Sequence, residues 1–154
     1  MIKSLLFDFS YVFLFPKDKK YSGTLNGLYK QLNEQNIKYN FWDFFELNID
    51  LLNYLNSIKI PKSIYTSGTI QNDLALKKVI NPKFSQIISA EISSLPKSDP
   101  ASYLQISKNL ALEPKNILFI DDDINNISVA KSAGLETLQY IDNLKLFADL
   151  NYLQ

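Results

Sequence analysis

Four short stretches of the sequence carry polar groups that could do chemistry together if the fold brings them to one place. They are, in chain order, Asp8, Thr66-Ser67-Gly68, Lys97 and Asp121-Asp122-Asp123. Carboxylates and substrate phosphate are ligands that Mg²⁺ accepts, and a lysine neutralises phosphate charge as a transition state forms. Hydroxyl and backbone N–H groups can hold phosphate oxygens. This set of groups therefore fits phosphoryl transfer onto a carboxylate.

Each stretch also has a plainer explanation. Asp8 could cap a loop, the stretch 66–68 is ordinary turn chemistry, and a lone lysine such as Lys97 is most often solvated. Three consecutive acids are harder to explain in this way, because adjacent carboxylates repel one another unless a cation or a partner offsets their charge. We therefore favour a metal site over a helix-capping loop at residues 121–123. The order and spacing of the four stretches together favour one shared site.

The residue types that are missing narrow the chemistry further. The chain has no histidine and no cysteine, and Lys+Arg and Asp+Glu balance at 16 each, so the formal net charge is zero. A Ser-His-Asp triad, a thiol nucleophile, a disulfide and a cysteine zinc site are excluded. The balanced charge gives no reason to expect a nucleic-acid or membrane-surface partner. Catalysis would have to use carboxylates, lysines, hydroxyls and hard cations.

The N-terminal stretch "MIKSLLFDFSYVFLFP" superficially resembles a secretion signal. Asp8 interrupts its apolar run, and no small-residue cleavage site follows. No run in the sequence is long and apolar enough to span a membrane. We therefore expect a cytoplasmic protein.

Short apolar runs alternate with amphipathic stretches along the chain. This pattern predicts strands at 4–9, 62–67, 84–90, 116–121 and 136–140, and helices at 23–36, 41–58, 70–80, 99–112, 125–134 and 143–153. Asp99 and Pro100 are typical of a helix start, and Gly134 of a helix end. The alternation predicts one domain over residues 1–154, with a Rossmann-like three-layer α/β/α fold and a mainly parallel five-stranded sheet. Ligands of such sheets bind beyond the carboxyl ends of the strands, where all four polar stretches fall.

Three stretches of this sequence resemble motifs of the haloacid dehalogenase superfamily of aspartyl-nucleophile phosphatases. The opening "LLFDFSYVF" is similar to the family's first motif, a hydrophobic strand followed by D-x-D-x-[TV]. The segment "SIYTSG" is similar to its second motif, a strand ending in Thr or Ser. The run "KSDPASYLQISKNLALEPKNILFIDDDINNISVAKSAGL" follows the family pattern K-P-D-P…Y…L…P…FIDD…N…A…AG nearly throughout. The resemblance covers most of the chain and is weakest across residues 16–45.

The resemblance implies a role for each stretch. Asp8 would be the nucleophile that forms an aspartyl-phosphate, and also a Mg²⁺ ligand. Thr66 would bind the transferring phosphoryl group, with Ser67 and Gly68 adding backbone donors. Lys97 would pair with Asp8 and with the phosphate.

The resemblance also implies how the metal would be held. Asp122 would complete the Mg²⁺ site with Asp121 beside it, and Asn126 stands where relatives carry an Asp or Asn that orients the cluster. Ser10 occupies a position that gives its backbone carbonyl to the metal in the family.

Ser10 is the main departure from the family pattern. Relatives carry a second aspartate there, which protonates the leaving group and then activates water, whereas a hydroxyl is neither an acid nor a base near pH 7. A positioned general acid–base contributes ~10²–10⁴-fold, so its loss should raise the barrier by roughly 3–5 kcal/mol. Ser10 therefore threatens turnover more than it threatens magnesium or phosphate binding.

Several functions remain compatible with a serine at this position. One is a slow phosphohydrolase acting on phosphate esters or acyl phosphates with good leaving groups. Another is the chemistry of relatives that lack this carboxylate, namely dehalogenases, phosphonate-cleaving enzymes and transport ATPases; dehalogenation is disfavoured because Asp121 and Asp122 are retained. A third is a catalytically inactive binding or regulatory module. A phospho-receiver domain is disfavoured because its acidic pair would follow the first strand.

The resemblance implies a minimal helical cap inserted at about 16–45, too small to seal a pocket alone. Tyr11 stands where relatives usually have glycine, and it either packs in the local turn or narrows the pocket entrance. The cluster "FWDFF" (41–45) is either core or, if exposed, a homodimer contact, and aromatic clusters at helical spacing favour core. The expected partner is a small phosphorylated metabolite or a phosphoprotein, with no nucleic acid and no membrane.

Overall fold

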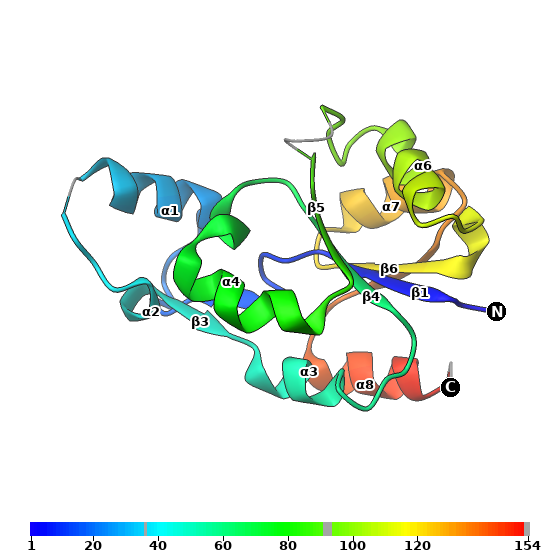
Figure 1. The fold of residues 1–154 in the computed structure, drawn as a ribbon, viewed down its shortest axis with the longest axis horizontal. Helices are drawn as coiled ribbons and strands as arrows, with labels where there is room; N and C mark the ends of the chain where they lie inside the picture. The colour runs from blue at the N-terminus through cyan, green and yellow to red at the C-terminus, as the bar shows by residue number, and fades with distance from the viewer. Residues whose placement is uncertain (36, 91–93, 153–154) are drawn as a thin grey trace.

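The centre of the molecule is a parallel sheet of five strands (Figure 1). The computed structural model describes residues 1–35, 37–90 and 94–152. The strands run in the order β5-β4-β1-β6-β7, and their bounds are β1 (Ser4–Phe7), β4 (Lys62–Thr66), β5 (Gln86–Ser89), β6 (Ile117–Asp121) and β7 (Glu136–Gln139). The predicted Rossmann-like sheet is therefore confirmed.

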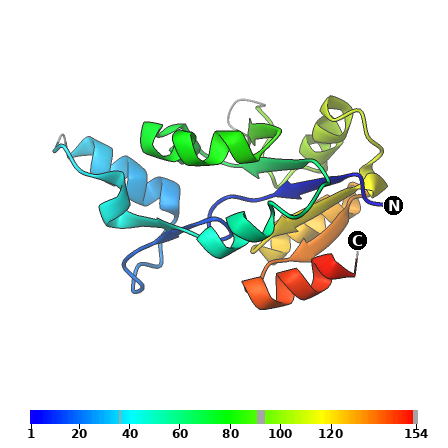
Figure 2. The same cartoon turned by 60° about the horizontal axis from the view of Figure 1, so that its bottom comes forward.

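Helices cover both faces of this sheet, which explains why its central strands are continuous apolar runs rather than alternating ones. One face packs against α3 (Ile49–Tyr54), α4 (Leu74–Ile80) and α8 (Asn143–Asn151). The other face packs against α6 (Pro100–Asn109) and α7 (Ile124–Ser132), whose buried members include Tyr103 and Ala130 (Figure 2). Every residue of β1 and of β6 is buried.

Several helix ends follow from single residues. The Asp99 side chain accepts a hydrogen bond from the Ala101 backbone N–H, with Pro100 at the first helical position of α6. Gly134 follows α7 with a φ of 89°, a conformation that favours glycine. The predicted helix at 70–80 is divided into η1 (Ile70–Asn72) and α4, because Asp73 is extended and caps α4. Two further 3₁₀ turns are η2 (Asn81–Lys83) and η3 (Pro114–Asn116).

The predicted single helix at 41–58 is wrong. The chain there forms α2 (Phe41–Phe44), β3 (Phe45–Leu47) and α3, and β3 pairs antiparallel with β2 (Leu14–Pro16). Asn48 causes the second break, because its side chain accepts a hydrogen bond from the Leu51 N–H and so starts α3. The apolar periodicity of the stretch did not reveal a strand of three residues.

The described residues that connect β2 to β3, 17–35 and 37–44, lie beyond the carboxyl end of β1 (Figure 1). This connecting segment contains α1 (Leu25–Glu34) and α2. Two members of the "FWDFF" cluster, Phe41 and Phe45, are buried and stack on each other with ring centroids 4.6 Å apart, whereas Phe44 is exposed. These two rings belong to the core, and homodimer formation stays a prediction.

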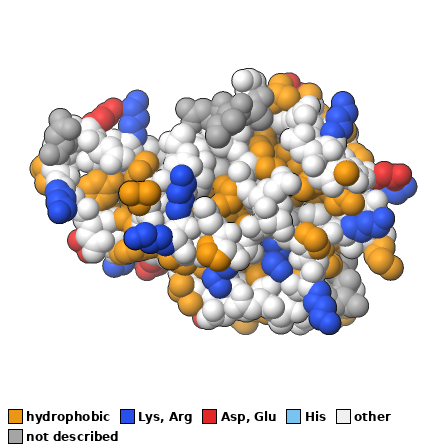
Figure 3. Space-filling view, viewed as in Figure 1, with side chains coloured by type: hydrophobic (Ala, Val, Ile, Leu, Met, Phe, Trp, Pro, Cys, Tyr) orange, Lys and Arg blue, Asp and Glu red, His pale blue; other side chains and the backbone are white. Residues whose placement is uncertain are grey.

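None of the helices in the described part of the chain has the length and apolar character needed to cross a bilayer. On the face shown in Figure 3, lysine side chains are spread over the surface and do not gather in one patch.

Candidate active site

The polar residues that follow the parallel strands meet in one cavity of about 240 Å³. Its lining combines members of the four sequence stretches with Ser10, Tyr11, Asn126 and three residues at the start of α1. The full set is Asp8, Ser10, Tyr11, Thr24, Leu25, Asn26, Thr66, Ser67, Lys97, Asp121, Asp122, Asp123 and Asn126. Of the predicted site residues only Gly68 is not part of this lining; it follows Ser67 directly. The structure thus brings the predicted groups together, while their chemical roles stay predictions.

The base of the cavity, which we call the charged floor, consists of Asp8, Lys97, Asp121 and Asp122. The Lys97 ammonium group donates to the Asp8 carboxylate and, at 3.1 Å, to Asp121 Oδ2. Lys97, Asp8 and Asp121 are all buried. The ammonium group also lies over the ring of Tyr65, 5.2 Å from its centroid. Lys97 is therefore a buried cation held by two carboxylates, not a solvated surface lysine.

Burial and mutual repulsion change the proton affinities of the charged floor. Burial raises the pKa of Asp8 to about 6, with Lys97 acting against this shift and Asp121 adding to it. Burial also raises the pKa of Asp122 to about 7, and the charges of Asp8 and Asp121 contribute. Burial alone would lower the pKa of Lys97, but the two carboxylates outweigh it and raise the pKa. Burial is thus the main cause of the raised pKa values of Asp8 and Asp122, and Lys97 opposes it only in part.

The carboxylates of the charged floor fit a divalent cation. Asp8, Asp121 and Asp122 each offer an oxygen atom, and these atoms all lie within 4.8 Å of one another. Oxygen ligands from carboxylates are what Mg²⁺ takes in proteins, with water and substrate phosphate completing its shell. Burial and neighbouring carboxylates disfavour the ionised forms of Asp8 and Asp122 and so raise their pKa values, and a bound cation would favour the ionised forms.

The three consecutive acids divide between the two explanations that the sequence left open. Asp121 accepts from Asn126 Nδ2 at 3.0 Å and from the Asp123 backbone N–H at 2.8 Å, so it is fixed in place. Asp122 joins the charged floor. Asp123 caps α7 by accepting from the Asn125 N–H at 2.8 Å. The triplet is both a carboxylate cluster and a helix cap.

The loop after β4 is fixed by side-chain hydrogen bonds to its backbone. Thr66 is buried at the end of β4, and the carbonyl of Gly68 accepts from Gln71 Nε2 at 2.6 Å and from Ser89 Oγ at 3.1 Å. These two contacts turn the Gly68 carbonyl toward the body of the protein. The hydroxyl-bearing residues Thr66 and Ser67 line the cavity.

Ser10 and Tyr11 form the side of the cavity. Ser10 makes an isolated bridge to Leu14, and the Tyr11 N–H donates to the Leu14 carbonyl at 2.8 Å. Tyr11 has a φ of 60°, which is uncommon for a residue with a side chain. Its hydroxyl donates to the Gly23 carbonyl at 2.6 Å, so the aromatic side chain spans from the turn to the connecting segment. Tyr11 thus packs against the hydrophobic core and also lines the cavity, and its effect on the pocket entrance stays a prediction.

Residues 24–26 also line the cavity, and we call these residues together with Tyr11 the roof. Thr24, Leu25 and Asn26 were not among the predicted site residues. Thr24 caps α1 by accepting a hydrogen bond from the Gly27 N–H. A threonine at this position is typical of a helix start, so the sequence could have predicted the cap. Nothing in the local sequence indicates that this helix start lies over the strand ends.

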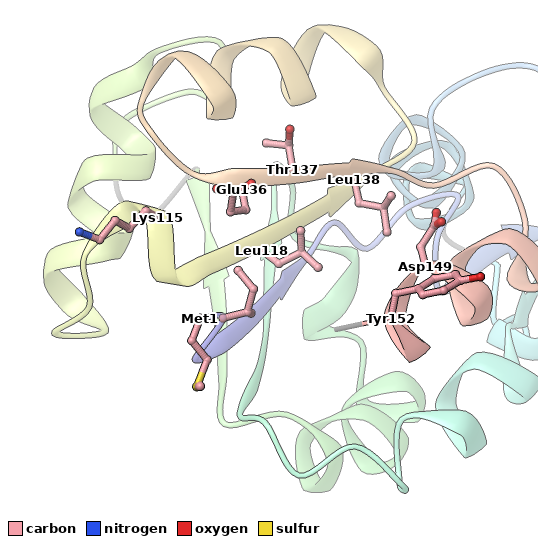
Figure 4. A pocket seen from close by; sticks show the side chains of 9 residues that line it. Met1, Lys115, Leu118, Glu136, Thr137, Leu138, Asp149 and Tyr152 are labelled. Atoms are coloured by element: carbon pink, nitrogen blue, oxygen red, sulfur yellow. The ribbon is translucent and has the colours of Figure 1, made fainter. Parts of the chain in front are cut away.

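A larger cavity, of about 540 Å³, lies at the opposite end of the strands (Figure 4). Leu118 and Leu138 form part of its wall, beside Glu136 and Tyr152. Two of its charged side chains are already paired, Lys115 with Glu113 and Asp149 with Lys145. It contains no cluster comparable to the charged floor within the described residues, so its size does not make it the reactive site.

Solved structures share this fold. A subfamily IA hydrolase of the HAD superfamily from Geobacter sulfurreducens superimposes with a TM-score of 0.70 at 16% identity, over 97% of this chain and all of that chain. A HAD family enzyme from Bacteroides thetaiotaomicron, solved in complex with magnesium and inorganic phosphate, gives a TM-score of 0.65 at 16% identity, over 96% of this chain. At such identities the likeness concerns the fold.

Curated relatives match part of the chain. Enolase-phosphatase E1 of Aquifex aeolicus is 36% identical over 87 residues, which cover 53% of this chain and 38% of that protein. Enolase-phosphatase E1 of Pseudomonas fluorescens is 34% identical over 79 residues, which cover 48% of this chain and 34% of that protein. The matched region thus spans little more than a third of these relatives. The family model described as haloacid dehalogenase-like hydrolase matches residues 24–134, and the chain belongs to that family.

Proposed function

We propose that this protein is a Mg²⁺-dependent phosphohydrolase that uses Asp8 as its nucleophile. The observation that carries the proposal is the position of Lys97, buried between the carboxylates of Asp8 and Asp121 with Asp122 beside them. A buried lysine next to an acidic cluster at the carboxyl ends of parallel strands suits a substrate that brings further negative charge with a divalent cation. The phosphatases among its relatives and the neighbour solved with magnesium and phosphate support this reading.

In the first step the Asp8 carboxylate would attack the phosphorus atom of the substrate. A bond forms between an Asp8 oxygen and phosphorus, the bond between phosphorus and the leaving oxygen breaks, and the leaving group departs with the bonding electron pair. Lys97 would neutralise charge on the phosphoryl oxygens, and Thr66 would hold one of them. In the second step a water oxygen would form a bond to the same phosphorus while the bond between phosphorus and the Asp8 oxygen breaks. The proton of the water would pass to solvent, inorganic phosphate would leave, and the Asp8 carboxylate would be restored.

The donor set of Asp8, Asp121 and Asp122, joined by the Ser10 backbone carbonyl, would hold the metal ion. When bound, Mg²⁺ supplies charge neutralisation for the phosphoryl group and the nucleophile. Asn126 keeps Asp121 oriented for this role through its hydrogen bond.

Ser10 restricts the substrates that such a site would turn over. Because a hydroxyl cannot protonate the leaving oxygen near pH 7, turnover would require a leaving group that is stable as an anion. Acyl phosphates and aryl phosphate esters meet this condition, whereas simple alkyl esters do not. The cavity volume of about 240 Å³ favours a small phosphorylated metabolite over a phosphoprotein.

Ser10 also supports a second candidate function. The serine could mark a binding or regulatory module that retains the magnesium and phosphate pocket and has lost turnover. Such a module would bind inorganic phosphate in a Mg²⁺-dependent way without hydrolysing esters.

Steady-state hydrolysis of p-nitrophenyl phosphate, with Mg²⁺ and with EDTA, separates the two. We expect slow metal-dependent turnover by the native protein, and a rise of ~10²–10⁴-fold in Ser10→Asp, which restores an acid–base. Ser10→Ala serves as the matched control and should leave the native rate within a few-fold. A silent native protein together with an active Ser10→Asp variant would identify the binding module. Silence in both would overturn the proposed hydrolase.

A further inference from the structure

We propose that Asn26 is a positioning residue that fixes the phosphate-binding loop, and that the roof is therefore fastened to the body of the protein and is not a free lid. The phosphate-binding loop is the stretch from Thr66 to Ile70, and its role in binding phosphate rests on the proposed function. The proposal concerns a contact between two parts of the chain that are more than forty positions apart. None of the four sequence stretches contains Asn26.

The contact is a side-chain oxygen that serves two backbone donors. Asn26 Oδ1 accepts from the Thr69 N–H and from the Ile70 N–H, each at 3.2 Å. These donors follow Gly68, whose carbonyl is held on the other side by Gln71 and Ser89. The peptide units after Gly68 are thus held from two directions, from the body of the protein and from α1.

The closeness of the two elements explains the glycine at position 68. A Cβ added to Gly68 would lie 2.2 Å from the Asn26 side chain, where no real contact can exist. Gly134 is the glycine with a positive φ, so Gly68 is not required by a left-handed backbone. What excludes a side chain at position 68 is the approach of Asn26.

Two more contacts fasten the same segment. Tyr29, one turn further along α1, donates its hydroxyl to Asp73 Oδ2 at 3.2 Å, and Asp73 caps α4. Before α1 in the chain, the Tyr11 hydroxyl donates to the Gly23 carbonyl. Leu25, between Gly23 and Asn26 in the chain, is buried. Opening the roof would break these hydrogen bonds and expose this leucine.

The consequence for ligand binding is pre-organisation. Backbone donors bind a phosphate more tightly when they are fixed before it arrives, because binding then loses no free energy to the ordering of the loop. Loss of the Asn26 contact should leave the charged floor intact and weaken phosphate binding through loop mobility alone. That outcome differs from loss of a charge in the floor.

The test compares Asn26→Leu, which removes the acceptor at similar volume, with Asn26→Asp, which keeps an acceptor oxygen. Gln31→Leu, at an exposed position on the same helix, is the matched control. Amide hydrogen exchange followed by NMR should show Thr69 and Ile70 exchanging about tenfold faster in Asn26→Leu and near the native rate in Asn26→Asp and Gln31→Leu. Equal exchange in Asn26→Leu and the native protein would overturn the proposal.

Inorganic phosphate with Mg²⁺, titrated by calorimetry, then measures the effect on the ligand. The dissociation constant should rise about five- to tenfold in Asn26→Leu and stay unchanged in Gln31→Leu. Faster exchange with unchanged phosphate affinity would mean that Asn26 only stabilises the fold, and would also overturn the positioning role. If the native protein binds no phosphate, the proposed function fails, while the exchange rates still decide whether the roof is fastened.

A double-mutant cycle tests the contact without any ligand. Gly68→Ala should destabilise the native protein more than it destabilises Asn26→Ala, because the truncated side chain leaves room for the new methyl group. Equal costs in the two backgrounds would show that the two residues do not compete for space and would contradict the geometry on which the proposal depends.

Discussion

The charged floor and the roof enclose the same cavity, but they are held together by different forces. The floor is an ionic cluster in which Lys97 is buried between carboxylates. The roof is held by neutral hydrogen bonds from Tyr11 and to Asn26, together with one buried leucine. Removing one member of a buried ionic cluster leaves an unpaired charge and costs about 3–5 kcal/mol, whereas one neutral hydrogen bond contributes about 1 kcal/mol. The comparison assigns the chemistry to the floor and the shape of the cavity to the roof.

The largest expected effect is the loss of catalysis in Asp8→Asn. Without a carboxylate at this position neither the nucleophile nor its share of the metal site remains, so hydrolysis of p-nitrophenyl phosphate should fall at least about 10³-fold. Circular dichroism should show an unchanged fold. Activity near the native level would remove Asp8 as the nucleophile and with it the chemical role given to the floor.

Lys97→Met should have the largest effect on stability. Three carboxylates would lose their buried cation, and the free energy of unfolding in urea at pH 7.5 without metal should drop by about 3–5 kcal/mol. Lys108→Met, at an exposed position on α6, is the control and should change it by less than about 0.5 kcal/mol. Similar values for the two variants would show that the Lys97 ion pairs do not hold the floor.

The acidity of Asp122 predicts how stability depends on pH. Its pKa is about 7 in the folded protein against 3.8 ordinarily, so the fold favours the protonated form and stability falls as pH rises from about 4 to about 7. In EDTA, Asp122→Asn should therefore be more stable than the native protein at pH 8, by about 1–2 kcal/mol after allowance for partial exposure.

At pH 3 the two proteins should have nearly equal stability, because Asp122 is then largely protonated in the unfolded state, where its pKa is 3.8, as well as in the folded state. Thermal melts at the two pH values measure the difference. A variant that is equally stabilised at both pH values would show that the gain comes from packing and not from the charge of Asp122.

The smallest effect is expected for Tyr11→Phe in the roof. The variant loses the hydrogen bond to the Gly23 carbonyl but keeps the ring, so thermal stability should fall by about 1 kcal/mol or less. KM for p-nitrophenyl phosphate should rise two- to threefold with kcat unchanged, since no group of the floor is altered. A fall in kcat with constant KM would instead place Tyr11 in the chemical step.

The floor could be predicted from the sequence because Asp8, Asp121 and Asp122 stand at the ends of buried strands, and Lys97 begins the "KSDP" stretch that resembles a family motif. Parallel strands bring such residues to one edge of the sheet whatever lies between them. The roof could not be predicted, because the Asn26 contact depends on where tertiary packing places α1 relative to Thr69 and Ile70. The break at Phe45 was missed for a related reason: β3 is defined by pairing with the distant β2, and its own three residues carry no periodic signal.

The pairing of β2 with β3 has a consequence for how this protein could change. Pro16 lies opposite Phe45, so the connecting segment leaves and re-enters the body of the protein at neighbouring points, about 5 Å apart. The cost of closing a loop grows slowly with its length, so segments of other lengths could be inserted there without disturbing the sheet. If the proposed function holds, exchange at this junction offers protein engineering a route to new substrate selectivity, with the carboxylates of the floor left in place.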